Sequence, residues 1–193
     1  MVSTNILNYL VCQIFWPIFF RNAGLTKFKS SAADLTFATK FCIMLLAIHN
    51  LIRWAILLFG VWTVFQAFTG LRTKRAFSST DNRTSLLFMI FCDIQLLIGL
   101  IIYYNNGHFE NLTNGMGNVM KNAYMRFYSV EHAFTMILAW VLVHVGRNAV
   151  KKAAPEHKHK RMLLFFGLAL LLILISIPWP FRPGIGKPLF PLF

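Results

Sequence analysis

"RFYSVEHAFTMILAWVLVHVGR", residues 126–147, joins a long apolar run to three ionisable side chains, Glu131, His132 and His144. The run is long enough for a helix that crosses a lipid bilayer, which needs about 20 predominantly apolar residues. A charged group at the centre of such a helix costs about 2.5–3.5 kcal/mol on insertion scales. The ionisable residues of this stretch are therefore candidates for a functional role.

Three further stretches resemble it in length and composition. The whole chain is 57% hydrophobic and 13% charged, whereas soluble domains carry about 25% charged residues. Helices satisfy their own backbone hydrogen bonds in lipid, and the apolar runs do not alternate with polar residues as membrane strands do. The sequence predicts an all-α, polytopic membrane four-helix bundle over residues 44–181, with a Pro-rich outer tail over 182–193. The expected spans are 44–69, 85–104, 126–146 and 162–178.

The distribution of basic residues predicts the orientation of the bundle. Many of them fall in the loops 70–84 and 147–161, whereas the Asn- and Gly-rich loop 105–125 holds only Lys121. Cytoplasmic loops carry the excess of Lys and Arg, so both basic loops are expected in the cytoplasm and the C-terminus in the periplasm of a bacterial inner membrane. The net charge of +13 does not indicate nucleic-acid binding, because no soluble surface remains to carry it.

Residues 1–43 fit this topology poorly. They contain a short apolar run, 5–20, which is interrupted by Pro17 and followed by basic residues that would lie outside if the run crossed the membrane. Two interpretations stay open for this extra N-terminal apolar segment. It is either an interfacial segment or the product of a mis-assigned start, with Met44 as the natural first residue.

Two histidines of the expected spans lie at one level of the membrane. With a rise of about 1.5 Å per residue, His49 lies roughly 7 Å and His132 about 9 Å from the outer ends of their helices. Two histidines at equal depth on facing helices match the axial ligation of a haem iron. Arg126, at the outer edge of its span, is the candidate partner of a haem propionate. On the residues alone, ligation and simple packing against a neighbouring helix are equally supported.

A second polar layer is expected deeper in the bundle. Arg53 and Asp93 fall at roughly 13 and 16 Å, which predicts a buried ion pair. Gln95 and Glu131 complete the expected buried polar network. Glu131 is a weak candidate for supporting His132, because it points about 100° away from it. His144 lies nearer the cytoplasmic end and is expected to be structural.

Six motifs carry a resemblance to a known family. The chain resembles small four-span integral membrane proteins of Bacteroidota that are labelled cytochrome b, over roughly 44–181. The resemblance implies a b-type cytochrome-like protein, with His49 and His132 on the ligand positions and His144 as the reserve ligand. The motifs are HNLIRW (49–54), DNR (81–83), DIQLLIGLIIY (93–103), MRFYSVEH (125–132), VHVGR (143–147) and IPWPF (177–181).

The leading hypothesis is an integral membrane subunit that transfers single electrons through one bis-histidine haem b. Its expected partners are the lipid bilayer and a quinone or respiratory-chain subunits, and a homo-oligomer stays open. One alternative is a haem-free structural or accessory subunit. Another is a proton- or solute-conducting protein that uses Arg53, Asp93 and Glu131. The sequence does not decide whether the protein is an enzyme, and it contains no catalytic triad, phosphate loop or metalloenzyme motif.

Overall fold

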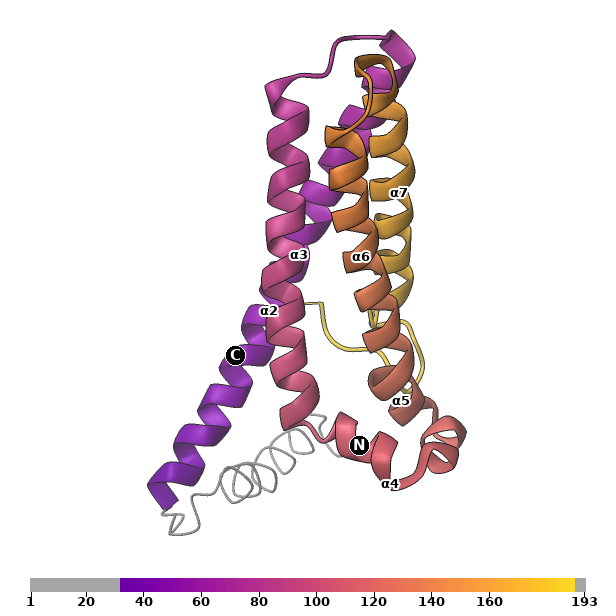
Figure 1. The fold of residues 1–193 in the computed structure, drawn as a ribbon. Coiled ribbons are helices and arrows are strands. Elements are labelled where there is room, and N and C mark those ends of the chain that lie inside the picture. Colours follow the sequence, from indigo (N-terminus) through magenta and orange to yellow (C-terminus); the bar gives the residue numbers. More distant parts are fainter. Residues whose placement is uncertain (1–31, 190–193) are drawn as a thin grey trace.

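Four long helices dominate the structure, a computed structural model that describes residues 32–189 (Figure 1). Side chains are described from residue 40 onward, except at Asn114. The helices run up and down beside one another, which confirms the predicted all-α bundle. They are α2 (Ala32–Thr73), α3 (Ser79–Asn105), α6 (His132–Lys151) and α7 (Lys158–Ser176).

Each of the four helical segments is long and apolar enough to cross a membrane. Their order along the chain matches the sequence prediction, but each extends several residues into the expected loops. In the third, α5 (Ala123–Arg126) leads into α6 through a π-helical turn, η1 (Phe127–Glu131). The spanning segments are Lys40–Thr73, Ser79–Asn105, Ala123–Lys151 and Pro155–Ser176.

The first helix does not begin at Met44, where the sequence placed a boundary. α2 starts at Ala32 and continues through residue 44 without a break. Its N-terminal part leans away from the other helices (Figure 1). Residues 32–43 thus belong to the first helix, while the expectations for residues 1–31 concern a part of the chain outside the described residues.

The start of α3 is fixed by a reciprocal cap. The Ser78 hydroxyl accepts a hydrogen bond from the backbone N–H of Asp81, and the Asp81 carboxylate accepts one from the Ser78 N–H. This capping box satisfies two backbone donors that a helix start otherwise leaves unpaired. The connection from α2 therefore ends at Ser78, and α3 begins at the next residue.

The Asn- and Gly-rich segment 105–125 is not a loop, which corrects the sequence prediction. It contains α4 (His108–Lys121), which lies across the end of the bundle opposite the α2–α3 connection (Figure 1). Gly107 precedes it with φ 69°, a left-handed conformation that glycine adopts without strain. The helix is kinked at Gly115, and apolar residues recur at helical spacing on each side of the kink: Phe109 and Leu112 before it, and Met116, Val119 and Met120 after it.

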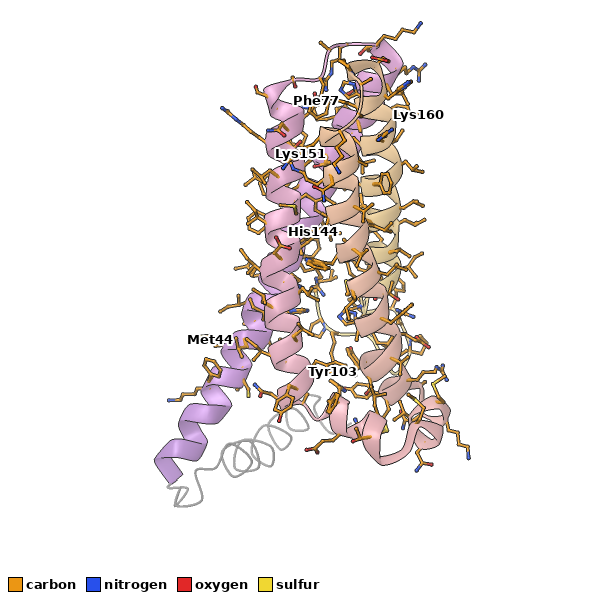
Figure 2. The ribbon with its side chains drawn as sticks, viewed as in Figure 1. Met44, Phe77, Tyr103, His144, Lys151 and Lys160 are labelled. Carbon is orange, nitrogen blue, oxygen red and sulfur yellow. The ribbon has the colours of Figure 1, made fainter. Side chains whose placement is uncertain are left out.

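The two ends of the bundle differ in charge. Lys151 and Lys160 lie at the same end as Phe77, and Tyr103 lies at the opposite end (Figure 2). The basic residues of the α2–α3 and α6–α7 connections therefore lie at one end of the bundle. Arg147 to Lys151 belong to α6, so the linking segment between the last two helices is shorter than expected.

Candidate functional site

His49 of α2 and His132 of α6 lie within electrostatic range of each other. Their side chains lie close enough that a charge on one acts on the other. His132 occupies the first position of α6, directly after the π-helical turn, and His49 lies on the part of α2 that packs beside α3. That these two residues share one level of the bundle stays a prediction.

Hydrogen bonding fixes the orientation of the His132 ring. Its Nδ1 lies 2.9 Å from the carbonyl oxygen of Ser176 on α7, and the Ser176 hydroxyl lies 3.3 Å from the same nitrogen. Because a carbonyl oxygen only accepts, the bond to it requires that Nδ1 carry the proton. The neutral ring then has its lone pair on Nε2. This is the tautomer that metal-binding histidines adopt when a carbonyl holds the other nitrogen.

His49 has a buried nitrogen that the described part of the chain leaves without a partner. This atom is Nδ1, which makes no hydrogen bond. An unsatisfied buried polar atom costs about 1–3 kcal/mol. Gly99 of α3 makes room for the ring, because a Cβ atom at that position would lie 3.3 Å from Cε1 of His49. Gln95 donates from Nε2 to the His49 carbonyl oxygen at 2.9 Å, so it braces α2 at this histidine.

A third histidine, which the sequence analysis missed, lies near His132. His108, at the start of α4, has its Nδ1 3.2 Å from the Ser129 hydroxyl and its ring 5.5 Å from that of Tyr103. Burial lowers the pKa of His108 to about 4, and the charges of His132 and Lys187 add to the effect. The helical spacing of the apolar residues in 108–121 was the signal that could have placed it near the bundle.

The three histidines do not form a conventional metal site. Within residues 40–189, no group of three or more His, Cys, Asp or Glu side chains is arranged to hold a metal ion. An axial pair on the two faces of a macrocycle needs only two such ligands. His49 and His132 have the residue types for that arrangement and lie within electrostatic range of each other.

The predicted buried ion pair between Arg53 and Asp93 is wrong. Arg53 donates from Nη2 to the carbonyl oxygen of Leu189 at 2.7 Å. Asp93 accepts a hydrogen bond from Trp140 Nε1 at 2.6 Å, and His144 Nε2 lies 3.3 Å from the same oxygen. Depth along a helix was estimated correctly enough to group these residues, but it does not say which way each one points around the helix.

Glu131 and Arg126 also depart from their expected roles. Arg126 Nε lies 2.8 Å from Glu131 Oε1, and both side chains are exposed, so Glu131 is not part of a buried network. The π-helical turn explains the pairing, because its i→i+5 hydrogen bonds bring residues five apart onto one face. Arg126 is already paired with a carboxylate and does not fit the expected role of a propionate partner.

The Pro-rich tail packs back onto the histidine end of the bundle. Tyr128 donates its hydroxyl to the carbonyl of Ile185 at 2.8 Å. Lys187 Nζ lies 5.7 Å from the centre of the Tyr128 ring, and burial lowers the pKa of Lys187. The guanidinium of Arg182 lies 4.6 Å from the Phe127 ring. Through these contacts the tail, which the sequence described only as a Pro-rich outer tail from 182 onward, packs against η1 near His132.

A separate polar cluster holds the opposite end together. Asp81 is fully buried and accepts two hydrogen bonds from Arg75, at 2.6 and 2.7 Å, which raise the pKa of Arg75. His159 Nε2 lies 3.4 Å from the same carboxylate. Arg147 donates to the Ser85 hydroxyl at 2.6 Å. The cluster joins α3, α6 and α7 to the α2–α3 connection. Its hydrogen bonds and ion pairs hold these elements together.

Comparisons with known proteins do not extend this description. No family model, curated protein or solved structure matches the chain.

Proposed function

We propose that the chain is a b-type cytochrome-like membrane subunit in which His49 and His132 are the axial ligands of one haem b. The observation that carries this proposal is the proximity of two imidazoles from facing helices, one of which keeps a buried nitrogen without a hydrogen-bond partner. Four helices long and apolar enough to span a membrane provide the surroundings. Helical bundles build cofactor sites from side chains on such facing helices.

The residues around the two imidazoles prepare them for ligation. The Ser176 carbonyl holds the proton of His132 on Nδ1, which leaves Nε2 free. Gln95 anchors the backbone of α2 at His49, and Gly99 leaves space for the His49 ring. Haem held in this way supplies reversible one-electron transfer. Two histidine ligands leave no open position on the iron, which favours electron transfer over oxygen activation.

The proposed location is the bacterial inner membrane, with the basic end of the bundle in the cytoplasm. Lys151 and Lys160 mark that end (Figure 2), in agreement with the excess of basic residues that cytoplasmic loops carry. The histidine pair then lies in the outer half of the membrane. A quinone or a neighbouring respiratory-chain subunit would exchange electrons there.

A haem-free structural subunit is the second candidate, and a specific observation favours it. Asp93 and His132 both have protein partners, Trp140 and Ser176, so the polar groups also serve to join helices. The conducting alternative has less support. Arg53, Asp93 and Glu131 contact three different partners and do not form a relay with one another.

The visible spectrum of the purified protein tests the proposal. The full chain, expressed with excess haem and purified in detergent, is expected to show a Soret band and, after dithionite reduction, a sharp α-band. His157→Ala is the matched control, because this exposed histidine lies at the far end of the bundle, and its spectrum should equal that of the wild type. A colourless wild-type protein that also fails to take up added haem would contradict the proposal and favour the structural subunit.

A further inference from the structure

Arg53 is a buried cation whose charge is not balanced by the described part of the protein. The residue is 7% exposed, and its Nε is buried without a hydrogen-bond partner. Every ion pair among the described side chains involves a different cation, namely Arg75, Arg126, His144, His157 or His159. A charge inside a membrane helix is costly unless it is paired.

Among the described residues, the Arg53 guanidinium donates a hydrogen bond to a neutral acceptor. Its Nη2 donates to the Leu189 carbonyl at 2.7 Å, and Trp54 Nε1 donates to the same oxygen at 3.2 Å. Two side-chain donors of adjacent residues thus converge on one oxygen atom. A backbone carbonyl accepts their hydrogen bonds but supplies no negative charge.

Two further cations lie at the end of the bundle where the tail packs. Arg182 and Lys187 of the tail lie against Phe127 and Tyr128, close to the same end of the bundle. The acidic residue of segment 123–151, Glu131, is exposed and bound to Arg126. An arginine matches a carboxylate best, because its planar donor set binds both carboxylate oxygens.

We propose that Arg53 and Trp54 form a binding site for the carboxylate of an amphiphilic ligand, and that the Leu189 carbonyl fills it when the ligand is absent. The carboxylate would belong either to a haem propionate or to a free fatty acid. The haem propionate as ligand rests on the proposed function. It is consistent with the four-residue spacing of His49 and Arg53, which places both on one face of α2. Arg53 and Trp54 thus take the role of propionate partner that the sequence assigned to Arg126, which has its own carboxylate partner.

Two pairs of probes test the site in nanodiscs that contain the full chain. One pair is haem and haem dimethyl ester, followed by absorption titration. The other is dodecanoic acid and its methyl ester, followed by calorimetry. In at least one pair, the wild type should bind the acid about tenfold more tightly than the ester, which corresponds to about 1.4 kcal/mol. Arg53→Gln should abolish this preference, and Arg53→Lys should keep part of it.

Controls separate this inference from the proposed function. Arg126→Gln should keep the preference, because that arginine is exposed and lies outside the site. Trp54→Phe keeps an apolar ring but removes the N–H donor, so it should lower the preference for the acid over the ester. This variant replaces Arg53→Gln in the test if Arg53→Gln fails to fold. Acid preference with dodecanoic acid alone, without haem binding, supports the site and contradicts the cytochrome proposal. Equal binding of haem and its diester, with no preference for dodecanoic acid, overturns the site and leaves the haem proposal standing.

Discussion

The imidazole of His159 occupies the space that a side chain at Gly70 would need. A Cβ atom added at Gly70 would overlap the ring at Cδ2 and Nε2. The same ring reaches the fully buried carboxylate of Asp81 at 3.4 Å. Helices α2, α3 and α7 therefore meet at one histidine, and the absence of a side chain on α2 permits that contact.

Gly70→Ala should destabilise the bundle. The added methyl group forces His159 away from Asp81, and overpacking of this kind costs about 1–3 kcal/mol. The measurement is thermal unfolding in detergent. Gly167→Ala is the matched control, because no atom lies within 4 Å of its added Cβ, and it should unfold no earlier than the wild type. Equal melting temperatures for both variants would contradict the packing described for His159.

Asp81→Asn should be much more damaging than Glu131→Gln. Asp81 is fully buried and holds Arg75, Ser78 and His159, so its loss leaves buried polar groups unpaired at a cost of about 3–5 kcal/mol. Glu131 forms an exposed ion pair with Arg126, worth about 0–1 kcal/mol. Chemical unfolding of the two variants in detergent makes the comparison. A larger loss for Glu131→Gln would reverse the ranking that the burial of these two carboxylates predicts.

Double-mutant cycles should find Asp93 coupled to Trp140 and not to Arg53. The pair Asp93→Asn and Trp140→Phe should show a coupling of about 0.5–3 kcal/mol, since the two side chains share a hydrogen bond of 2.6 Å. The cycle of Asp93→Asn with Arg53→Gln should give a value near zero. Strong coupling in the second cycle would restore the ion pair that the sequence suggested.

Acidification should weaken, through His108, the end of the bundle that carries α4. Its pKa is about 4 in the folded chain and 6.5 ordinarily, so the unfolded state binds the extra proton between these values. Stability from the neutral ring is complete above pH 6.5 and is lost as the pH falls toward 4. Melting temperatures at pH 7 and pH 5 should differ less in His108→Gln than in the wild type. An identical pH dependence would show that His108 does not titrate in this way.

The sequence was sufficient for the architecture because apolar length alone identifies membrane spans. It placed four helices in the right order and grouped the basic residues at one end. It failed at α4, where Asn and Gly concealed helical spacing on either side of Gly115, and it placed the start of the first helix at residue 44, which lies inside a continuous helix.

The depth of the candidate site residues along their helices could be predicted, but the direction in which each side chain points could not. The rise per residue brought His49 and His132 to one level, where the structure also places them near each other. It could not foresee that a π-helical turn would pair Arg126 with Glu131, or that the tail would fold back to Arg53. These features depend on local backbone irregularity and on long-range packing, which periodicity does not encode.

The electron paramagnetic resonance spectrum of the oxidised, haem-loaded protein tests the axial pair most directly. Two imidazole ligands from His49 and His132 predict a low-spin ferric signal in the wild type. Either His49→Ala or His132→Ala should convert it to a high-spin signal or abolish haem binding, while His144→Ala and His108→Gln should keep it low-spin. A low-spin signal that persists in both His49→Ala and His132→Ala would contradict the assignment of these two ligands.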